Sequence, residues 1–334
     1  MTTLLESRYR AVLRLLPAYY RREREEEMVE TYLWDVDQET QEQSRPTLGE
    51  VASIVALAVR SRLGAGGTPR RYAVLGSAVR LFALFAVLLQ AASAVVDRVL
   101  GLTWASTRGG SQWALFTDGF TGHGVWAGAG AVAQWFLPLL WTVAYFALLR
   151  DHRRLAQVSA LVAALPTLFP LVDLWARDFA PSDSAYVVAA AVLAWASALA
   201  LCAAHHRDAP PAALPAGAPG LVFAACCVLM GGSIVALPGG VDTVWALVTC
   251  YLVTALAWLL YRARGENRVP AAEAAALAAL GLLLLVVRIT AVYPWLDLLP
   301  GALRVGVLTQ AAALVALTAA LAVVSGRDLL SRGT

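Results

Sequence analysis

The stretch AEAAALAALGLLLLVVRITAVY, residues 272–293, carries no charge apart from Glu273 near its start and Arg288 near its end. A helix of about 20 apolar residues crosses the ~30 Å hydrocarbon core of a bilayer, so the stretch is typical of a transmembrane helix. The rest of the chain is similar, with 59% hydrophobic residues and a mean hydropathy of +0.65 over 334 residues. The sequence therefore indicates a membrane protein rather than two or three soluble domains.

Apolar runs of this length recur along the chain and give eight predicted spans. The spans cover residues 78–100, 129–149, 155–176, 184–204, 219–237, 242–261, 272–293 and 302–325. The fifth span is the weakest, because it is short and lies between Pro- and Gly-rich segments. We expect an all-α, polytopic membrane fold with a small three-helix cytosolic domain at its N-terminus.

The arginines outside the spans predict the orientation. With the N-terminus inside, the cytosolic connections and the C-terminal tail hold Arg150, Arg153, Arg154, Arg207, Arg262, Arg264, Arg268, Arg327 and Arg332. The outward connections hold only Arg98, Arg108, Arg177 and Arg304. An excess of arginine marks the cytosolic side, so both chain ends are predicted to lie in the cytosol.

The composition indicates a bacterial origin and excludes several classes of protein. All 26 basic residues are Arg, which is typical of a GC-rich bacterial genome and predicts the bacterial cytoplasmic membrane as the location. Without Lys the chain has neither a P-loop lysine nor a Schiff-base amine. The net charge of +3 is small and follows the membrane topology, so no nucleic-acid partner is expected. The four cysteines lie in apolar runs and show no metal-ligand spacing.

Charge is concentrated at the N-terminus. Residues 1–72 hold 11 Arg and 11 Asp or Glu, of 26 and 23 in the whole chain. We interpret residues 1–66 as an aqueous module, residues 67–77 as a linker, residues 78–326 as the transmembrane domain and residues 327–334 as a cytosolic tail. No signal peptide is predicted, because the first 70 residues contain no apolar segment followed by a small-residue cleavage site.

Three amphipathic helices are predicted in this module: from residue 4 to about 16, from Pro17 to about Gln38, and from a capping box at Thr47 and Glu50 to about Leu63. Their predicted buried faces are Tyr9, Val12, Leu13 and Leu16 in the first helix, Met28, Val29, Tyr32, Leu33 and Val36 in the second, and Leu48, Val51, Ile54, Val55 and Ala58 in the third. So small a domain is near the lower size limit for independent stability.

The segment YRAVLRLLPAYYRREREEEMVETYL, residues 9–33, resembles the start of HAAS-type and permease-prefix domains. The resemblance covers about residues 5–65. It implies a small helical domain in front of a bacterial transmembrane region, with a regulatory role, and it supplies no catalytic residues. The chain departs from the transporter-type members of that group, because it has no room for a large extracytoplasmic domain.

The second helix carries Glu23, Glu26, Glu27 and Glu30 on the side facing away from its apolar stripe. One interpretation is a solvated surface, which is what most charged helix faces are. The other is a docking face for a cytosolic regulatory protein. On the second interpretation the protein relays or tethers a signal at the membrane.

Two charged residues inside spans carry the alternative hypothesis, a transporter or permease component. Asp173 in the third span and Arg288 in the seventh are predicted at matching depths near the outer end. Intramembrane charges are costly and mark transport paths by default, so an ion pair between them would line a polar path. Otherwise Arg288 extends toward the headgroups and Asp173 belongs to the interface.

The outward connection, residues 101–128, is rich in Gly and aromatic residues. We interpret it as an interfacial, re-entrant segment with Trp104, Trp113, Phe116 and Trp126 at the headgroup level. A sensing role for Asp118 and His123 is the alternative. Elsewhere no hydrolase, metalloprotease or dinucleotide motif occurs, so we expect no enzyme, no catalytic residue, no metal site and no cofactor.

Overall fold

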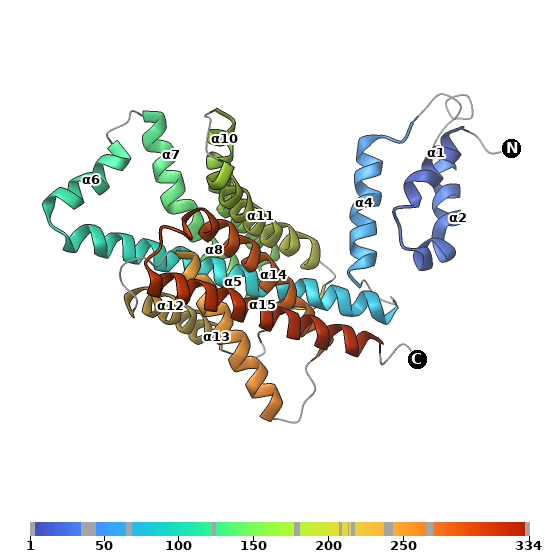
Figure 1. The fold of residues 1–334 in the computed structure, drawn as a ribbon. Coiled ribbons are helices and arrows are strands. Elements are labelled where there is room, and N and C mark those ends of the chain that lie inside the picture. Colours follow the sequence, from blue (N-terminus) through green and yellow to red (C-terminus); the bar gives the residue numbers. More distant parts are fainter. Residues whose placement is uncertain are drawn as a thin grey trace. The chain divides into compact units, whose positions relative to one another are not determined.

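The computed structural model describes residues 4–34, 45–64, 69–121, 125–176, 181–206, 209–212, 214, 218–236, 243–264 and 270–330. Every regular element in these ranges is helical (Figure 1). The chain forms two compact units, residues 1–77 and residues 78–334. The all-α prediction is therefore confirmed.

The first unit contains α1 (Leu4–Leu13), α2 (Ala18–Trp34) and α4 (Leu48–Arg62). Tyr9, Leu13, Leu16, Val29, Ile54 and Ala58 form its buried core. The rings of Tyr9 and Tyr32 stack with centroids 4.0 Å apart, which joins α1 to α2. The predicted capping box is present, because the Thr47 hydroxyl accepts from the Glu50 amide and the Glu50 carboxylate accepts from the Thr47 amide.

Some details of the predicted module are wrong. α1 ends at Leu13 rather than residue 16, in a turn before Pro17. Leu48, predicted to be buried, is 89% exposed, because it is the first residue of α4 and no neighbouring helix covers that end. Val55 is also exposed, since the inward face of α4 is centred on Ile54 and Ala58. The predicted end of the second helix and Val36 lie outside the described residues.

The second unit is built from long apolar helices. Its elements in chain order are α5 (Arg70–Thr107), which begins in the first unit, then α6 (Gly110–Thr121), α7 (Val125–Phe136), η1 (Leu137–Leu139), α8 (Leu140–Leu149), α9 (Arg153–Ala164), η2 (Leu165–Thr167), α10 (Leu168–Ala176), α11 (Pro181–Ala204), α12 (Pro219–Ala236), α13 (Thr243–Arg264), α14 (Ala271–Val292), η3 (Tyr293–Trp295) and α15 (Gly301–Leu330). Eight helical segments in the described ranges are long and apolar enough to cross a membrane, which agrees with the eight predicted spans. The protein is an integral membrane protein with multiple spans.

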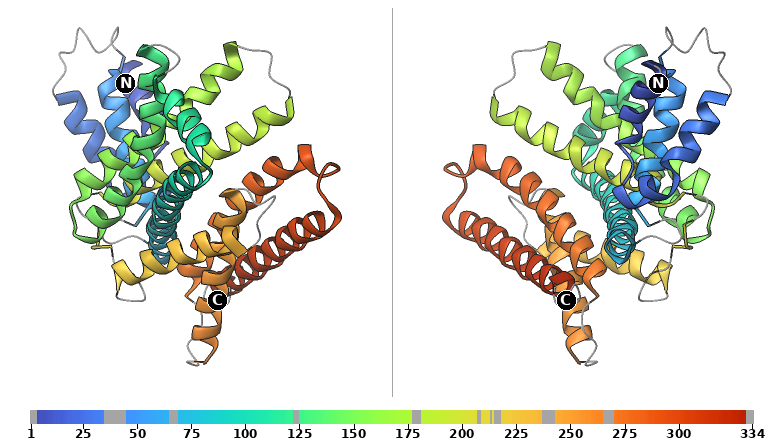
Figure 2. Two further views of the ribbon diagram at one scale, coloured as in Figure 1. Left: turned by 90° about the vertical axis from the view of Figure 1, so that its left-hand side faces the viewer. Right: turned by 90° about the vertical axis from the view of Figure 1, so that its right-hand side faces the viewer.

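α5 is longer than the predicted first span. It runs over 38 residues, or ~57 Å at 1.5 Å per residue, and so exceeds the ~30 Å hydrocarbon core. It is also the most central helix, because 61% of its most apolar window is buried, against 11% for α12. Figure 2 shows α5 nearly end-on among the surrounding helices.

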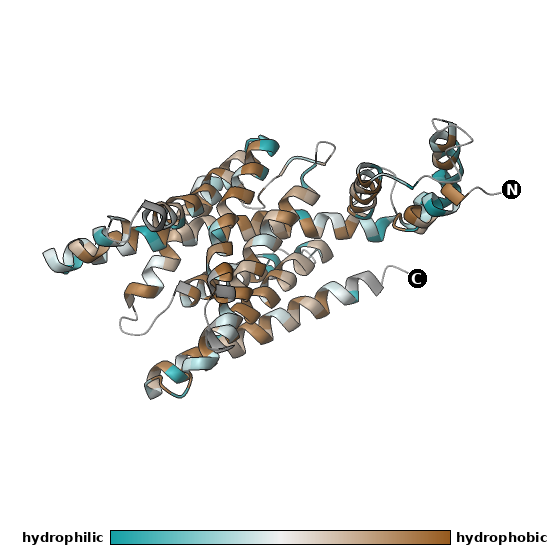
Figure 3. Cartoon of the chain, turned by 90° about the horizontal axis from the view of Figure 1, so that it is seen from above, coloured by the Kyte–Doolittle hydropathy of each residue, from teal (hydrophilic) through white to brown (hydrophobic). Residues whose placement is uncertain are grey.

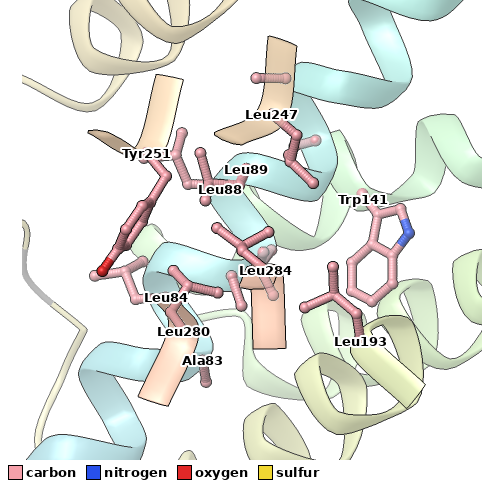
Figure 4. Close-up of a cluster of buried hydrophobic side chains, with 14 of the residues drawn as sticks. Ala83, Leu84, Leu88, Leu89, Trp141, Leu193, Leu247, Tyr251, Leu280 and Leu284 are labelled. Atoms are coloured by element: carbon pink, nitrogen blue, oxygen red, sulfur yellow. The ribbon is translucent and has the colours of Figure 1, made fainter. Parts of the chain in front are cut away.

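The remaining spans pack around α5 in pairs. α14 lies beside α15, α8 beside α9, and α12 beside α13, while α11 contacts both α9 and α14 (Figures 1 and 2). In the core, Leu84 and Leu88 of α5 meet Leu280 and Leu284 of α14, with Leu193 of α11 nearby (Figure 4). Many large apolar side chains are exposed instead, and Figure 3 shows hydrophobic residues along the whole length of the long helices. Outward apolar faces are expected where the solvent is lipid.

Two of the spans are each interrupted by a proline in a short 3₁₀ turn. Pro138 is the middle residue of the 3₁₀ turn η1 between α7 and α8, and Pro166 is the middle residue of η2 between α9 and α10. Proline has no amide N–H, so the helical hydrogen bond to the carbonyl four residues earlier cannot form. The two turns contact each other inside the unit, which gathers both irregularities at one place.

Candidate functional sites

The acidic face of α2 is exposed as predicted at Glu23, Glu26, Glu27 and Glu30. Its carboxylates are not equivalent. The guanidinium of Arg10 on α1 donates two hydrogen bonds to Glu26, at 2.8 and 2.9 Å, and this pairing holds the pKa of the Glu26 carboxyl below its ordinary value. Glu27 lies 3.7 Å from Arg24 on the same helix. Within this face, Glu26 therefore serves mainly to join α2 to α1.

A groove of about 430 Å³ lies beside this face, between α1, α2 and α4. We call it the tyrosine groove, and its lining residues are Tyr9, Tyr20, Arg24, Glu27, Met28, Thr31, Tyr32 and Glu50. The sequence pattern assigned Tyr9, Met28 and Tyr32 to the core of the module. In the structure they pack there and also form one wall of the groove.

The polar groups of the groove are held in place. The Tyr32 hydroxyl donates to the Glu50 carboxylate at 3.1 Å, and burial together with that carboxylate raises the pKa of Tyr32 to about 12. Glu50 is also fixed by the capping box of α4. The groove thus combines aromatic surface with two carboxylates, Glu27 and Glu50, and one guanidinium, that of Arg24 beside Glu27, so its side-chain charge is net negative. This combination suits a cationic side chain, which gains from both aromatic faces and negative charge.

The predicted outer connection is helical, with α6 and α7 packed against each other. The Phe116 ring contacts the rings of Trp113, Phe120 and Trp135 at 5.1–5.6 Å between centroids. Asp118 is exposed on α6. His123 and the side chain of Trp126 lie outside the described residues, so the sensing and interfacial interpretations of this segment stay predictions.

Of the predicted intramembrane pair, only the Arg288 side chain lies among the described residues. Arg288 of α14 is buried, with 1% of its surface exposed, and its guanidinium carbon lies 5.4 Å from the ring centroid of Trp245. Asp173 belongs to α10, but its side chain lies outside the described residues. A bond between Asp173 and Arg288 therefore stays a prediction.

A different polar cluster lies inside the second unit. A partly open cavity of about 190 Å³ is lined by residues of α5, α8, α9, α11, α13 and α14 together with η1 and η2. We call it the polar cavity, and its polar lining side chains are Gln90, Ser93, Asp97, Arg98, Thr167 and Tyr186. Asp97 and Arg98 lie with their charged atoms 3.8 Å apart, and their side chains are 29% and 17% exposed.

The sequence analysis missed this cavity, although a signal was present. Gln90, Ser93 and Asp97 recur at helical spacing on one face of an otherwise apolar helix, which places their side chains in one row. Arg98 was assigned to an outward connection. In the structure α5 continues through Arg98 to Thr107, and the Arg98 side chain lines the polar cavity.

Arg98 has a definite structural task at the mouth of the cavity. Its Nε donates to the carbonyl of Trp135 at 2.9 Å and one terminal nitrogen donates to the carbonyl of Gln134 at 2.8 Å. In an unbroken helix the Gln134 carbonyl would accept from residue 138, but Pro138 has no N–H. The arginine supplies the donor that the proline lacks, and it also stacks 5.6 Å from the Trp135 ring centroid.

Among the described residues, no group of three His, Cys, Asp or Glu side chains has the geometry of a metal site. Comparison with known proteins gives no family model, no curated protein and no solved structure that matches the chain. Its class is thus defined by its own fold, that of an α-helical membrane protein with eight spans.

Proposed function

We propose that the protein anchors a docking module to a bacterial cytoplasmic membrane and thereby relays or tethers a signal. Residues 1–66 bind a cytosolic regulatory protein, and the eight spans hold the complex at the bilayer. The observation that carries the proposal is the tyrosine groove, which places Tyr9, Tyr20 and Tyr32 beside Glu27 and Glu50 on a module with an exposed acidic helix.

The chemistry of the groove selects a basic partner. An Arg or Lys side chain that enters it meets tyrosine faces and carboxylates together, so cation–π and charge attraction add. Glu23 and Glu30 are exposed on α2. Exposed charges act over ~10 Å at ordinary salt, so these two carboxylates speed encounter with a positive surface. The resemblance to HAAS-type and permease-prefix domains supports a regulatory role independently of the groove.

The proposal is tested with the full-length protein in lipid nanodiscs. The nanodiscs capture proteins from bacterial cytosol, and the captured proteins are identified by mass spectrometry. We expect one soluble protein to be retained by the wild type and lost with Glu27→Arg, because Glu27 lines the groove.

Glu30→Arg is the matched control, since it changes the same charge on an exposed residue of the same helix outside the groove lining. Capture that is equal for the wild type and Glu27→Arg would contradict the proposal. Loss with both variants would assign docking to the whole acidic face rather than to the groove.

A further inference from the structure

The polar cavity carries an inference that is independent of the docking module. It is a partly open space of about 190 Å³, several times the ~30 Å³ that one water occupies in the liquid. A helical bundle in lipid gains stability by close packing, so a cavity lined by a carboxylate, a guanidinium, an amide and hydroxyls costs stability. Such intramembrane polar groups are by default candidates for a functional site.

The backbone around the cavity supports a binding role. Pro138 of η1 and Pro166 of η2 both line it, and these are the positions where two spans are broken. Interrupted membrane helices are tolerated where they border a protein-lined or water-filled site, because the released backbone groups find partners there. The structure contains one of those partners, since Arg98 donates a hydrogen bond to the Gln134 carbonyl, which Pro138 cannot serve because it has no N–H.

The charges define the ligand class. The closest charged atoms of Asp97 and Arg98 are 3.8 Å apart, longer than a hydrogen bond between ions, and both side chains remain partly exposed at the cavity. Two groups of opposite sign thus border one small space. A ligand with a single charge would pair with one of them and leave the other uncompensated in a partly desolvated site, whereas a zwitterion compensates both.

We infer that the polar cavity binds a small zwitterion of about amino-acid size. Its ammonium group pairs with the Asp97 carboxylate, and its carboxylate pairs with a terminal nitrogen of Arg98. The two backbone carbonyls that hold Arg98 fix the guanidinium in the required place before the ligand arrives. Trp141 in the cavity lining gives the site an aromatic wall of low polarity.

The test is isothermal titration calorimetry on the full-length protein in nanodiscs at neutral pH. The probes are glycine, L-alanine and β-alanine as zwitterions, with ethylammonium and propionate as ions of similar size and single charge. We expect saturable binding of at least one zwitterion and at least tenfold weaker binding of both single-charged probes.

Three variants locate the binding in the cavity. Asp97→Asn keeps the shape of the side chain and removes its charge, and Ala190→Leu fills the cavity without changing any charge. Each is expected to weaken zwitterion binding at least tenfold. Asp118→Asn makes the same chemical change as Asp97→Asn on exposed α6 and should leave the affinity unchanged.

The inference is overturned if none of the three zwitterions binds, if either single-charged probe binds as tightly, or if Asp97→Asn and Ala190→Leu keep the wild-type affinity. Circular dichroism confirms that each variant keeps its helix content. Because the module does not contribute to the cavity lining, this result and the docking result can fail separately.

Discussion

At the scale of single residues, Arg98 shows how a charge can be accommodated among apolar helices. Its guanidinium donates to two carbonyls, stacks on Trp135 and lies next to Asp97. The donors are needed because Pro138 removes an N–H from the same stretch of backbone. Arginine and proline should therefore be energetically coupled, although they are 40 positions apart in the sequence.

A double-mutant cycle tests this coupling. Arg98→Met alone should lower the free energy of unfolding by roughly 1–3 kcal/mol, since it removes the donor to the exposed Gln134 carbonyl and to the partly buried Trp135 carbonyl. In a Pro138→Ala background the helix supplies its own N–H, so the same Arg98 substitution should cost less. Thermal unfolding of the four proteins in one detergent measures the coupling, and equal costs in both backgrounds would show that Arg98 does not replace the missing donor.

Glu26 permits a prediction about pH in the aqueous module. Arg10 lowers the pKa of its carboxyl in the folded state, so the pair stabilises the module above the ordinary glutamate pKa of about 4.3 and loses this effect as the pH falls through the lowered value. With Arg10→Gln the Glu26 pKa should return to its ordinary value.

Carboxyl ¹³C shifts recorded during an acid titration measure that pKa, with Glu26→Gln used for assignment. Glu30, which is exposed on the same helix, serves as the internal reference. A Glu26 midpoint that does not move when Arg10 is replaced would contradict the pairing.

At the scale of elements, the sequence determines the spans well and their interruptions poorly. A run such as residues 272–293 is long and apolar enough to identify a membrane helix with no tertiary information. The continuation of α5 to Thr107 could not be predicted in the same way, because its last turns are not apolar enough to read as a span. Likewise, helical periodicity placed Leu48 and Val55 inward, but only the actual neighbours of α4 determine which side is covered.

The candidate sites differ in the same way: features set by local sequence were predicted, and features set by tertiary contacts were not. The exposure of Glu23 and Glu30 follows from the position of the apolar stripe on α2, so it was predicted from local periodicity. The polar cavity depends on six spans that meet from distant parts of the chain, and a single sequence does not determine such contacts. Only the row of Gln90, Ser93 and Asp97 indicated it in advance.

Packing between α13, α14 and α15 depends on one glycine. A Cβ added to Gly281 would lie 2.4 Å from the Thr318 hydroxyl and 2.5 Å from the Tyr251 hydroxyl. Tyr251 cannot easily move away, because its hydroxyl donates to the Leu277 carbonyl at 2.8 Å. Small residues allow this close approach of helices in membranes.

We therefore expect Gly281→Ala to lower the free energy of unfolding by roughly 1–3 kcal/mol, the usual cost of overpacking a dense core. Gly231→Ala in α12 is the control, since no atom outside its own backbone neighbourhood lies within 4 Å of the added Cβ. Thermal unfolding in detergent compares the two. Helix propensity favours Ala over Gly in both variants, so only the contact can account for a loss at Gly281. A Gly281→Ala protein as stable as Gly231→Ala would contradict the contact.

At the scale of the whole molecule, two solvents explain the division of the chain. Charged residues gather in the first unit, where 11 of the 26 arginines fall in residues 1–72, and apolar helices make up the second. The structure also sharpens the argument about orientation. Arg98 of α5 is partly exposed, donates to the Trp135 carbonyl and lines the polar cavity, so we leave it out of the count for the outward connections.

With Arg98 removed, the connections predicted to face outward keep only Arg108, Arg177 and Arg304, against nine arginines in the connections and tail predicted to face inward. Eight spans return the chain to the side on which it started. The positive-inside rule then predicts that both ends lie in the cytosol.

Reporter fusions test this topology in bacterial cells. Green fluorescent protein placed after Thr334 should fluoresce, because it folds in the cytosol, and alkaline phosphatase at the same place should be inactive. Alkaline phosphatase inserted after Arg108 should be active, since that position is predicted to be outside, whereas insertion after Arg150 should give no activity. Active phosphatase at Thr334 together with inactive phosphatase at Arg108 would invert the topology. The module would then face away from the cytosol, and docking of a cytosolic partner would be impossible.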